Sequence, residues 1–362
     1  MKRAMLALLC ACAALAVSAG ASWAVQYTIR DLGTLGGAES TAHGINNSGQ
    51  VVGWAYTASG HQHAFFWQMG SPIQDLGTLG GSGSIASGLN SGGQVVGGST
   101  IGYDWHAFSW QGGSPMQDLG SLGGSYGFAH GIDNSGRVVG DACVADGADH
   151  AFLWQNGSMQ DLGTLGGERS SACGINDSGQ VVGEAETSDS NPPLSPQSHA
   201  FLWQDGAMQD LGTFGGNNSC AFGINNGGQV VGGAQTAGYD WHAFLWQGGA
   251  KQDLGTLGGA DSVAYGINNS GQVVGYAATS DPYFTRLHAF LWQGGTMQDL
   301  GTLPGGLAST AFGINDRAQV VGWADDSTGR YHAVLWDPVP EPSALLALIG
   351  GLGALLAFRR RR

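Results

Sequence analysis

Short apolar runs and turn residues alternate along most of the chain. In residues 262–303 the runs "SVAYGIN", "QVVGYA", "HAFLWQ" and "MQDLGTL" are separated by "NSG", a variable stretch and "GGT". Runs of this length that are rich in Val, Ile, Phe and Trp are typical of β-strands. The pattern predicts four short strands. Asn268 and Gly271 suit the hairpin between the first two, because both residue types tolerate positive φ.

This unit recurs seven times. One marker is a histidine followed by alanine, at His63, His106, His150, His199, His242, His288 and His332. A second marker is the aspartate of "DLG", at Asp31, Asp75, Asp118, Asp161, Asp210, Asp253 and Asp299, with successive spacings of 44, 43, 43, 49, 43 and 46 residues. Four strands in about 43 residues, repeated, are typical of β-propeller blades.

The ends of the repeat region are permuted. It opens with "VQYTIRDLG", a lone fourth strand, and closes with "HAVLWD", a third strand that lacks its fourth. We therefore predict an all-β, seven-bladed β-propeller over residues 25–337, closed by its N-terminal strand. A β-solenoid or an open array of sheets is the alternative, but an open array would not need the split blade. The last unit departs from the pattern at Pro304, Arg317, Ala318 and Val334.

The repeats resemble the HAF extracellular repeat family, which is named for the triplet seen here as His242-Ala243-Phe244. The resemblance spans residues 27 to about 336. It implies secretion and repetition, and it transfers no catalytic chemistry.

Both ends of the chain have the features of targeting segments. Residues 1–24 combine a basic start, an apolar run and small residues, which predicts a cleavable secretory signal, although Cys12 could instead be a lipidated first residue. Pro340, Glu341 and Pro342 precede the uncharged stretch 343–358 and four arginines, 359–362. That stretch would form a helix of roughly 24 Å, slightly short of the roughly 30 Å hydrocarbon core, with the arginines on the cytoplasmic side.

Residues 338–362 resemble the PEP-CTERM sorting signal of Gram-negative bacteria. The resemblance implies recognition by an exosortase, transient insertion of the helix into the inner membrane, and cleavage near the Pro-Glu-Pro motif. An ordinary C-terminal membrane anchor is the alternative. Both interpretations place residues 25–337 outside the cytoplasm, at the cell surface or in the extracellular space.

Composition narrows the class of ligand. Glycine accounts for 65 of 362 residues and charged residues for 11%, which disfavours long, salt-bridged helices. Residues 25–337 contain seven basic and 26 acidic residues, so the exported part should repel nucleic acid and anionic membranes. The spacing of Cys143, Cys173 and Cys220 forms no metal or disulfide framework. We interpret them as buried small residues with at most one bridge.

No catalytic residue, metal site or cofactor is predicted. Seven equivalent copies make His242 a structural hydrogen-bonding group, as in WD-repeat propellers, where a similar recurring histidine and aspartate tie strands together. "GGSYG" at 123–127 matches the letters of a nucleophile elbow but follows a repeated strand-to-strand loop. Residues 188–191 and the pair Asp325-Asp326 could bind calcium, yet they lack the spacing of an EF-hand and are better explained as solvated carboxylates.

Length variation points to the binding surface. From the Asn or Asp of "GIN" or "GID" to the histidine, the count runs 17, 16, 17, 23, 17, 20 and 17 residues, so insertions concentrate between the second and third strands. Loops on a rigid scaffold commonly carry binding groups. These loops hold the candidate ligand-binding residues Tyr103, Asp104, Trp105, Tyr239, Asp240, Trp241, Tyr283 and Phe284.

We expect these loops to surround one mouth of the central channel, where aromatic rings would stack on sugars and aspartates would accept hydroxyl groups. The alternative is that the aromatic residues pack against neighbouring blades. The sequence thus favours an exported, non-catalytic propeller that binds a glycan or a protein. An extracellular polysaccharide hydrolase or lyase, or a passive spacer, is the alternative function. The sorting-signal resemblance adds an association with exopolysaccharide producers.

Overall fold

The computed structural model describes residues 25–188, 196–280 and 286–339. Residues Thr28–Asp337 form one compact unit. The signal segment, the Pro340-Glu341-Pro342 motif and the helix expected at 343–358 lie outside the described residues. In the described ranges no helix is long and apolar enough to cross a membrane.

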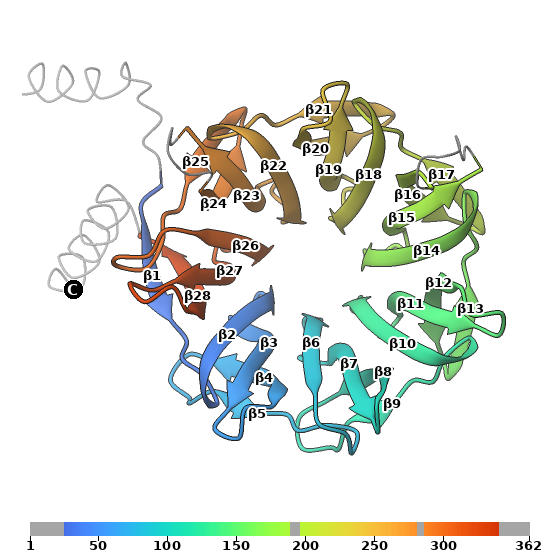
Figure 1. The fold of residues 1–362 in the computed structure, drawn as a ribbon, viewed down its shortest axis with the longest axis horizontal. Helices are drawn as coiled ribbons and strands as arrows, with labels where there is room; N and C mark the ends of the chain where they lie inside the picture. The colour runs from blue at the N-terminus through green and yellow to red at the C-terminus, as the bar shows by residue number, and fades with distance from the viewer. Residues whose placement is uncertain (1–24, 189–195, 281–285, 340–362) are drawn as a thin grey trace, which may run out of the picture. The chain divides into compact units, whose positions relative to one another are not determined.

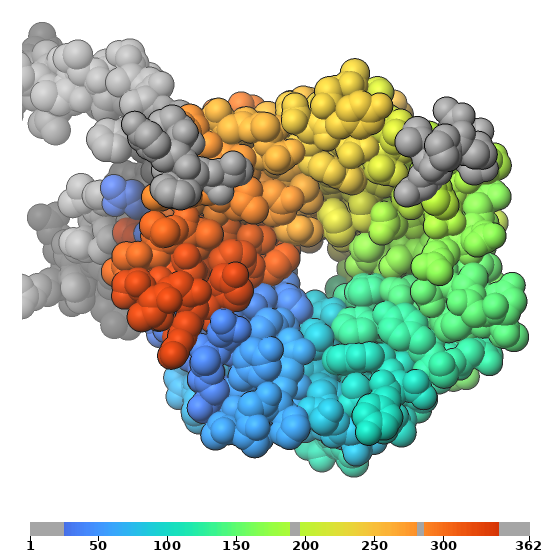
Figure 2. All heavy atoms as spheres, in the orientation of Figure 1, coloured from blue at the N-terminus to red at the C-terminus, as the bar shows by residue number. Residues whose placement is uncertain are grey.

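The unit Thr28–Asp337 is a seven-bladed β-propeller (Figure 1). Each blade is a four-stranded antiparallel sheet, and the blades surround a central channel that is open in the space-filling view (Figure 2). Along each blade the strands follow chain order, except that β1 joins β28 in the order β1-β28-β27-β26. The prediction of an all-β, seven-bladed propeller closed by its N-terminal strand is confirmed.

The first four blades have these strands. Blade 1 consists of β2 (Gly36–Ile45), β3 (Gln50–Thr57), β4 (Gln62–Gln68) and β5 (Gln74–Asp75). Blade 2 consists of β6 (Ser84–Leu89), β7 (Val95–Ile101), β8 (Asp104–Trp110) and β9 (Gln117–Asp118). Blade 3 consists of β10 (Gly123–Ile132), β11 (Val138–Val144), β12 (Asp149–Gln155) and β13 (Ser158–Asp161). Blade 4 consists of β14 (Gly166–Ile175), β15 (Val181–Thr187), β16 (Ser198–Gln204) and β17 (Ala207–Asp210).

The last three blades follow the same order. Blade 5 consists of β18 (Gly215–Ile224), β19 (Val230–Thr236), β20 (Trp241–Gln247) and β21 (Ala250–Asp253). Blade 6 consists of β22 (Gly258–Ile267), β23 (Val273–Thr279), β24 (Leu287–Gln293) and β25 (Thr296–Asp299). Blade 7 consists of β26 (Ser309–Ile314), β27 (Val320–Asp325), β28 (Tyr331–Pro338) and the permuted strand β1 (Tyr27–Asp31).

The hydrophobic core lies between blades rather than at one centre. One cluster joins Phe65 and Val51 of blade 1 to Val321, Ala333 and Leu335 of blade 7, and other pairs of neighbouring blades form similar clusters. The triplet phenylalanine is fully buried in blades 1 to 6, at Phe65, Phe108, Phe152, Phe201, Phe244 and Phe290. Each blade is therefore stabilised by its neighbours, as expected of a repeat that cannot bury its apolar faces alone.

The hairpins between the first and second strands depend on hydrogen bonding by asparagine. In blade 6 the Asn268 Oδ1 accepts the backbone N–H groups of Ser270 (3.1 Å) and Gln272 (3.0 Å). Gly271 has a φ of 77°, whereas Asn268 is not among the residues with positive φ. The hairpin therefore forms where the sequence indicated it, with left-handed backbone at Gly271 and with Asn268 capping the turn through its side chain.

The same asparagines link each blade to the next, and we call this ring the asparagine collar. In six blades the buried side-chain Nδ2 donates to the backbone carbonyl of the equivalent residue in the next blade, at 3.0–3.1 Å. The donors are Asn46, Asn90, Asn176, Asn225, Asn268 and Asn315. The last donates to the carbonyl of Asn46, so the collar closes the ring between blades 7 and 1.

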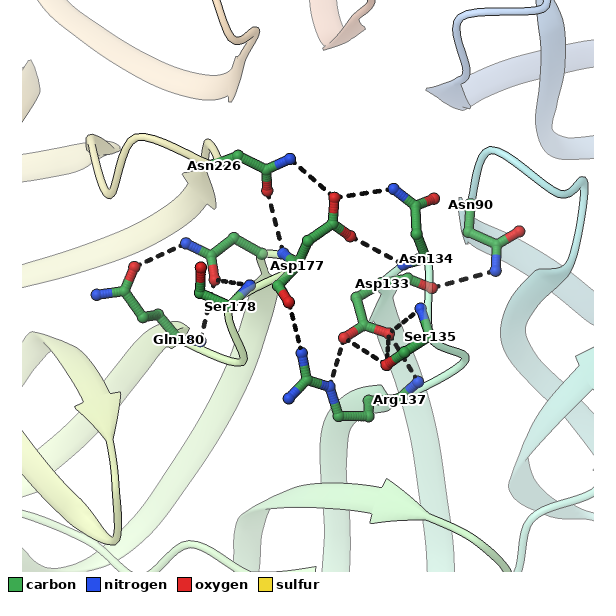
Figure 3. A network of polar contacts seen from close by, with 10 residues as sticks. Asn90, Asp133, Asn134, Ser135, Arg137, Asp177, Ser178, Gln180 and Asn226 are labelled. Carbon is green, nitrogen blue, oxygen red and sulfur yellow. Dashed lines mark hydrogen bonds and ion pairs between the residues drawn. The ribbon is translucent and has the colours of Figure 1, made fainter.

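Blade 3 builds this link from different residues (Figure 3). Asp133 replaces the asparagine, and a carboxylate has no N–H to donate. Arg137 replaces the glutamine that follows four residues later in every other blade. Its Nε contacts the Asp133 carboxylate at 2.5 Å, and its guanidinium donates to the Asp177 carbonyl of blade 4 at 3.0 Å. The paired substitutions preserve the connection between blades.

A second set of bridges crosses from the third strand of one blade to the first strand of the next. A buried serine hydroxyl accepts the N–H of the triplet alanine and donates to a carbonyl of the "DLG" loop, as Ser262 does with Ala243 (2.9 Å) and Gly255 (2.6 Å). The equivalent serines are Ser40, Ser84, Ser170, Ser219 and Ser309. Blade 3 again differs, with Gly127 at this position.

The collar can be tested in blade 3. We expect Arg137→Gln to lower the free energy of unfolding by about 3 kcal/mol, because it leaves the Asp133 carboxylate, whose side chain is 0% exposed, without its cation. The double variant Asp133→Asn/Arg137→Gln restores the arrangement of the other blades. It should recover stability to within about 1 kcal/mol of the original. Denaturant unfolding of the four proteins measures the coupling, and additive losses would contradict the paired link.

Candidate functional site

The two described tyrosines of the predicted binding loops are exposed at hairpin tips. Tyr103 lies between β7 and β8 and is fully exposed, and Tyr239 lies between β19 and β20 with 63% of its surface exposed. Exposed aromatic rings of this size are uncommon on a propeller whose other large apolar side chains mostly pack between blades. They offer flat apolar surfaces to a ligand.

An aspartate follows each tyrosine. The side chains of Asp104 and Asp240 are exposed, and within the described part of the chain neither carboxylate takes part in a hydrogen bond or an ion pair. Each of these hairpins therefore exposes an aromatic side chain and, at the next residue, an unpaired carboxylate.

The tryptophan after each aspartate lies between blades. The Trp105 ring is 5.7 Å from the Phe128 ring of blade 3, with planes 43° apart. The Trp241 ring covers Gly233, where a Cβ atom would lie 3.0 Å from a ring carbon and 3.2 Å from Val263 of blade 6. The backbone N–H of Trp241 also donates to Asp261 of blade 6 at 2.9 Å. For Trp105, the alternative of packing against a neighbouring blade is observed, whereas Trp241 lies over its own blade and is linked to blade 6 through its backbone.

The described second hairpins do not line the two cavities on the channel axis. The cavities on the channel axis, each of about 200 Å³, are lined by the first-strand ends and the first hairpins, such as Gly44, Ile45, Asn46 and Asn47. The first strands end at the channel and begin farther out (Figure 1), and Gly123 at the outer start of β10 pairs with the end of β11. The second hairpin of this blade therefore lies near the outer start of the first strand, farther from the channel axis than the first hairpin. Tyr283 and Phe284 lie outside the described residues.

The polar channel mouth satisfies its own hydrogen bonds. The Asp177 carboxylate accepts the Asn134 and Asn226 side chains at 2.9 and 2.8 Å, and Asp316 accepts Asn269 and Asn47 in the same way. Burial raises the pKa of each aspartate, but these hydrogen bonds outweigh it and the net shift is downward. We interpret this mouth as a structural ring between blades.

The repeated histidines each contact the repeated aspartate. His242 Nδ1 lies 2.7 Å from Asp253, and in blade 7 His332 lies 2.8 Å from Asp31 of the permuted strand. The other five pairs have distances of 2.8–3.1 Å. The contact joins the third strand to the end of the fourth in every blade, which supports the structural interpretation of His242.

A cavity that the sequence did not indicate lies between blades 3 and 4. It has a volume of about 290 Å³ and is lined by Asp141, Asp149, Arg169, Ser170, Ser171, Glu184, Glu186 and Ser198. Asp141 accepts His130 at 2.6 Å and Ser171 at 3.0 Å. Burial, followed by the charges of Asp141 and Glu186, raises the pKa of Glu184. Asp141 and Glu184 occupy the position after "VVG", which varies between repeats, and that variation was the available signal.

The cysteines and loop aspartates add no metal site. Cys143, Cys173 and Cys220 are free thiols, and Cys220 alone of these three is buried, so Cys143 and Cys173 are less buried than expected. Asp325 Oδ1 accepts the N–H groups of Leu307 and Ala308 at 2.7 and 2.8 Å, which occupies it within its own blade. In the described ranges no group of three or more His, Cys, Asp or Glu residues could hold a metal ion.

No protein-family model matches this chain, and no curated relative does. Solved structures with a similar fold include the β-propeller domain of the trilobed protease from Pyrococcus furiosus, at 10% identity and a TM-score of 0.57, covering 83% of this chain and 95% of that one. The lectin BP39L from Burkholderia pseudomallei has 12% identity and a TM-score of 0.51, covering 84% and 99%.

A third similar structure is the acylaminoacyl peptidase from Pyrococcus horikoshii, at 12% identity and a TM-score of 0.53, covering 86% of this chain. The match spans only 54% of that peptidase. At these identities the similarities establish the propeller fold alone.

The pair His288–Asp299 should make stability depend on pH. The hydrogen bond to Asp299 raises the pKa of His288 above 6.5, so its stabilisation is present below that pH and is lost as pH rises through the shifted pKa. Burial raises the pKa of Asp299, but the bonds from His288 and Gly301 outweigh it and hold it below 3.8, so its stabilisation is lost as pH falls through that lower value.

We therefore expect the melting temperatures of the original protein and of Asp299→Asn to differ most between about pH 4 and 6.5, with the difference shrinking on either side. Asp104→Asn, which removes an exposed carboxylate without a hydrogen bond, controls for net charge. A difference that stays constant across this range would show that the pair is not ionically coupled.

Proposed function

We propose that the protein is an exported, non-catalytic propeller that binds a glycan through the hairpin tips at Tyr103 and Tyr239. The glycan belongs to the cell surface or the extracellular matrix. A protein ligand is the alternative, and the binding experiment must distinguish it from a glycan.

The backbone of Tyr239 is the observation that carries the proposal. Tyr239 has a φ of 68°, in the left-handed region. The equivalent turn position is glycine in blades 1, 3 and 7, where Gly60, Gly147 and Gly329 have φ values of 83°, 96° and 80°. A non-glycine residue costs about 1–2 kcal/mol in this conformation. A residue in this unfavourable conformation that also leaves 63% of its surface exposed gains little from burial, which supports a role in binding.

The chemistry of the tips suits a neutral sugar. An aromatic ring offers its apolar face to the C–H side of a pyranose, and an unpaired carboxylate accepts hydroxyl hydrogen bonds. With seven basic and 26 acidic residues in 25–337, the protein should disfavour polyanionic ligands. We therefore propose an uncharged glycan.

Export rests on the resemblance of the two ends to targeting segments. The signal segment 1–24 would direct secretion, and an exosortase would act on the Pro340-Glu341-Pro342 motif while the following stretch is in the inner membrane. The proposed location is the cell surface or the extracellular space after processing.

Substitution of Tyr239 separates binding from folding. We expect Tyr239→Gly to leave the free energy of unfolding unchanged or to raise it by up to about 1 kcal/mol, because glycine relieves the left-handed strain. The same variant should weaken binding to the exopolysaccharide of the producing cells by at least about 3-fold, because an aromatic contact is lost. Titration calorimetry and denaturant unfolding provide the two measurements.

Tyr331→Ala is the matched control. Tyr331 is 44% exposed but packs on Trp323 at 4.7 Å, so its loss should reduce stability and spare binding. Lower stability with full binding in Tyr239→Gly would contradict the proposal. Release of reducing ends from the polysaccharide, abolished by Glu184→Gln, would instead favour the hydrolase and the cavity between blades 3 and 4.

C-terminal processing is tested by mass spectrometry of protein recovered from the cell exterior. We expect the mature chain to end near residues 339–342, because the uncharged stretch 343–358 is short for a permanent anchor and contains Gly350, Gly351 and Gly353. Recovery of the peptide "ALLAFRRRR" from the mature protein would rule out processing and leave a membrane-anchored propeller.

A further inference from the structure

The segment "GYDWHAF" occurs twice in the chain, at residues 102–108 in blade 2 and 238–244 in blade 5. In both copies tyrosine is the last residue of the turn between the second and third strands, and aspartate follows it. Tryptophan lies one residue before the structural histidine. The turns themselves differ. Blade 2 has a two-residue turn with Ile101 paired to Asp104, whereas the Thr236 N–H in blade 5 bonds to the Asp240 carbonyl across a three-residue turn. The same three side chains are thus presented from two turn geometries.

The two copies share a further feature on the second strand. After "VVG", blades 2 and 5 have glycine, Gly98 and Gly233, whereas the other five blades have Trp54, Asp141, Glu184, Tyr276 and Trp323. A Cβ atom at Gly233 would lie 3.0 Å from the Trp241 ring, and one at Gly98 would lie 2.3 Å from Phe128, on which the Trp105 ring packs. The glycine makes room for the tryptophan and its neighbour from the next blade.

Glycine, tryptophan, aspartate and the exposed tyrosine therefore form one module, which we call the Tyr-Asp-Trp module. The tryptophan is partly buried and fixes the start of the third strand, and the tyrosine and aspartate project from it. Only the tyrosine and the aspartate remain available to a ligand. Because both modules present the same groups, both should select the same chemical unit.

Blades 2 and 5 are not neighbours. Two blades separate them in one direction around the ring and three in the other (Figure 1). One sugar unit therefore cannot contact both modules. A molecule that uses both must carry the same unit at two separated points, which is a property of a polymer with a repeating unit.

We propose that the propeller is bivalent and that its two Tyr-Asp-Trp modules hold two separated units of the same uncharged polysaccharide chain. This inference rests on the proposed function, since it assigns two equivalent sites to the glycan. After the first module binds, the second binds an already tethered chain. Such linkage raises the apparent affinity by roughly 10²–10⁴-fold without any new type of contact, provided that the polymer spans both sites.

The experiment compares short and long forms of one ligand. Exopolysaccharide from the producing cells is used intact and after partial hydrolysis to fragments too short to span both sites. Titration calorimetry of the fragments should give two equivalent sites per chain. Tyr103→Ala or Tyr239→Ala should reduce this number to one without changing the affinity of the remaining site, and the double variant should not bind.

The intact polysaccharide tests whether both modules act on one chain. Either single variant should weaken its apparent affinity by about 10²-fold, toward the affinity of a fragment. Tyr331→Ala, which lies outside both modules, should change neither measurement. A single variant that leaves the affinity for intact polymer unchanged would overturn bivalency.

The remaining outcomes distinguish the two proposals. One fragment per chain, with binding abolished by either single variant, would indicate one composite site and overturn bivalency while leaving glycan binding intact. No binding of fragments or polymer to the original protein would overturn the proposed function itself.

Discussion

The fold depends on one recurring interaction, the donation of a buried asparagine amide to a carbonyl of the next blade. A ring of seven sheets closes only if each interface keeps the same angle, and hydrophobic side chains alone tolerate a range of angles. The asparagine Nδ2 and the backbone carbonyl meet at 3.0–3.1 Å in six interfaces, next to the channel where the blades lie closest. A buried donor without an acceptor costs about 1–3 kcal/mol, so each bond fixes the position of its neighbour.

Tight contact at the channel explains the glycines of "GIN". A Cβ atom at Gly174 would lie 3.0 Å from the Phe222 carbonyl of the next blade, and one at Gly266 would lie 2.8 Å from the Phe312 carbonyl. Side chains are excluded at this position, and the glycine is present in all seven copies of the stretch. The residue after "VVG" and the second hairpin vary more between blades. The groups that could recognise a ligand are found at those positions.

The number of blades and the closing strand could be predicted because both are matters of repetition and order. Seven copies of "DLG", a lone strand at the start of the repeat region and a last unit that lacks its fourth strand can be recognised without knowledge of side-chain geometry. The collar could not be predicted in the same way, since "GIN" indicates a turn but not that Asn268 reaches Asn315 in the next blade. That contact joins residues one repeat apart, and the local pattern carries no information about the angle between blades.

The candidate site could be predicted only in part, because the local sequence does not show how side chains pack between blades. The sequence located aromatic residues on the second hairpins, but it could not separate the exposed Tyr103 from the packed Trp105, two residues away. Strand alternation alone would place residues two positions apart on the same side, but Tyr103 lies in the turn before β8 begins, so the turn geometry decides its exposure. The outward position of these hairpins also follows from the slant of the first strands, which depends on packing around the channel. The cavity at Asp141 and Glu184 forms only where two blades meet, so the sequence of one repeat does not indicate it.

Blade 3 shows that the connection between blades is a stronger constraint than the identity of the residues that make it. Its chain has lost the collar asparagine and the bridging serine, with Asp133 and Gly127 in their places. The collar link is nevertheless kept, because Arg137 neutralises Asp133 and donates to blade 4 one residue farther along, at Asp177. An acidic residue buried at 0% side-chain exposure is unfavourable unless it is paired. The arrangement therefore indicates that the connection between blades must be kept, whereas the residues that make it can change.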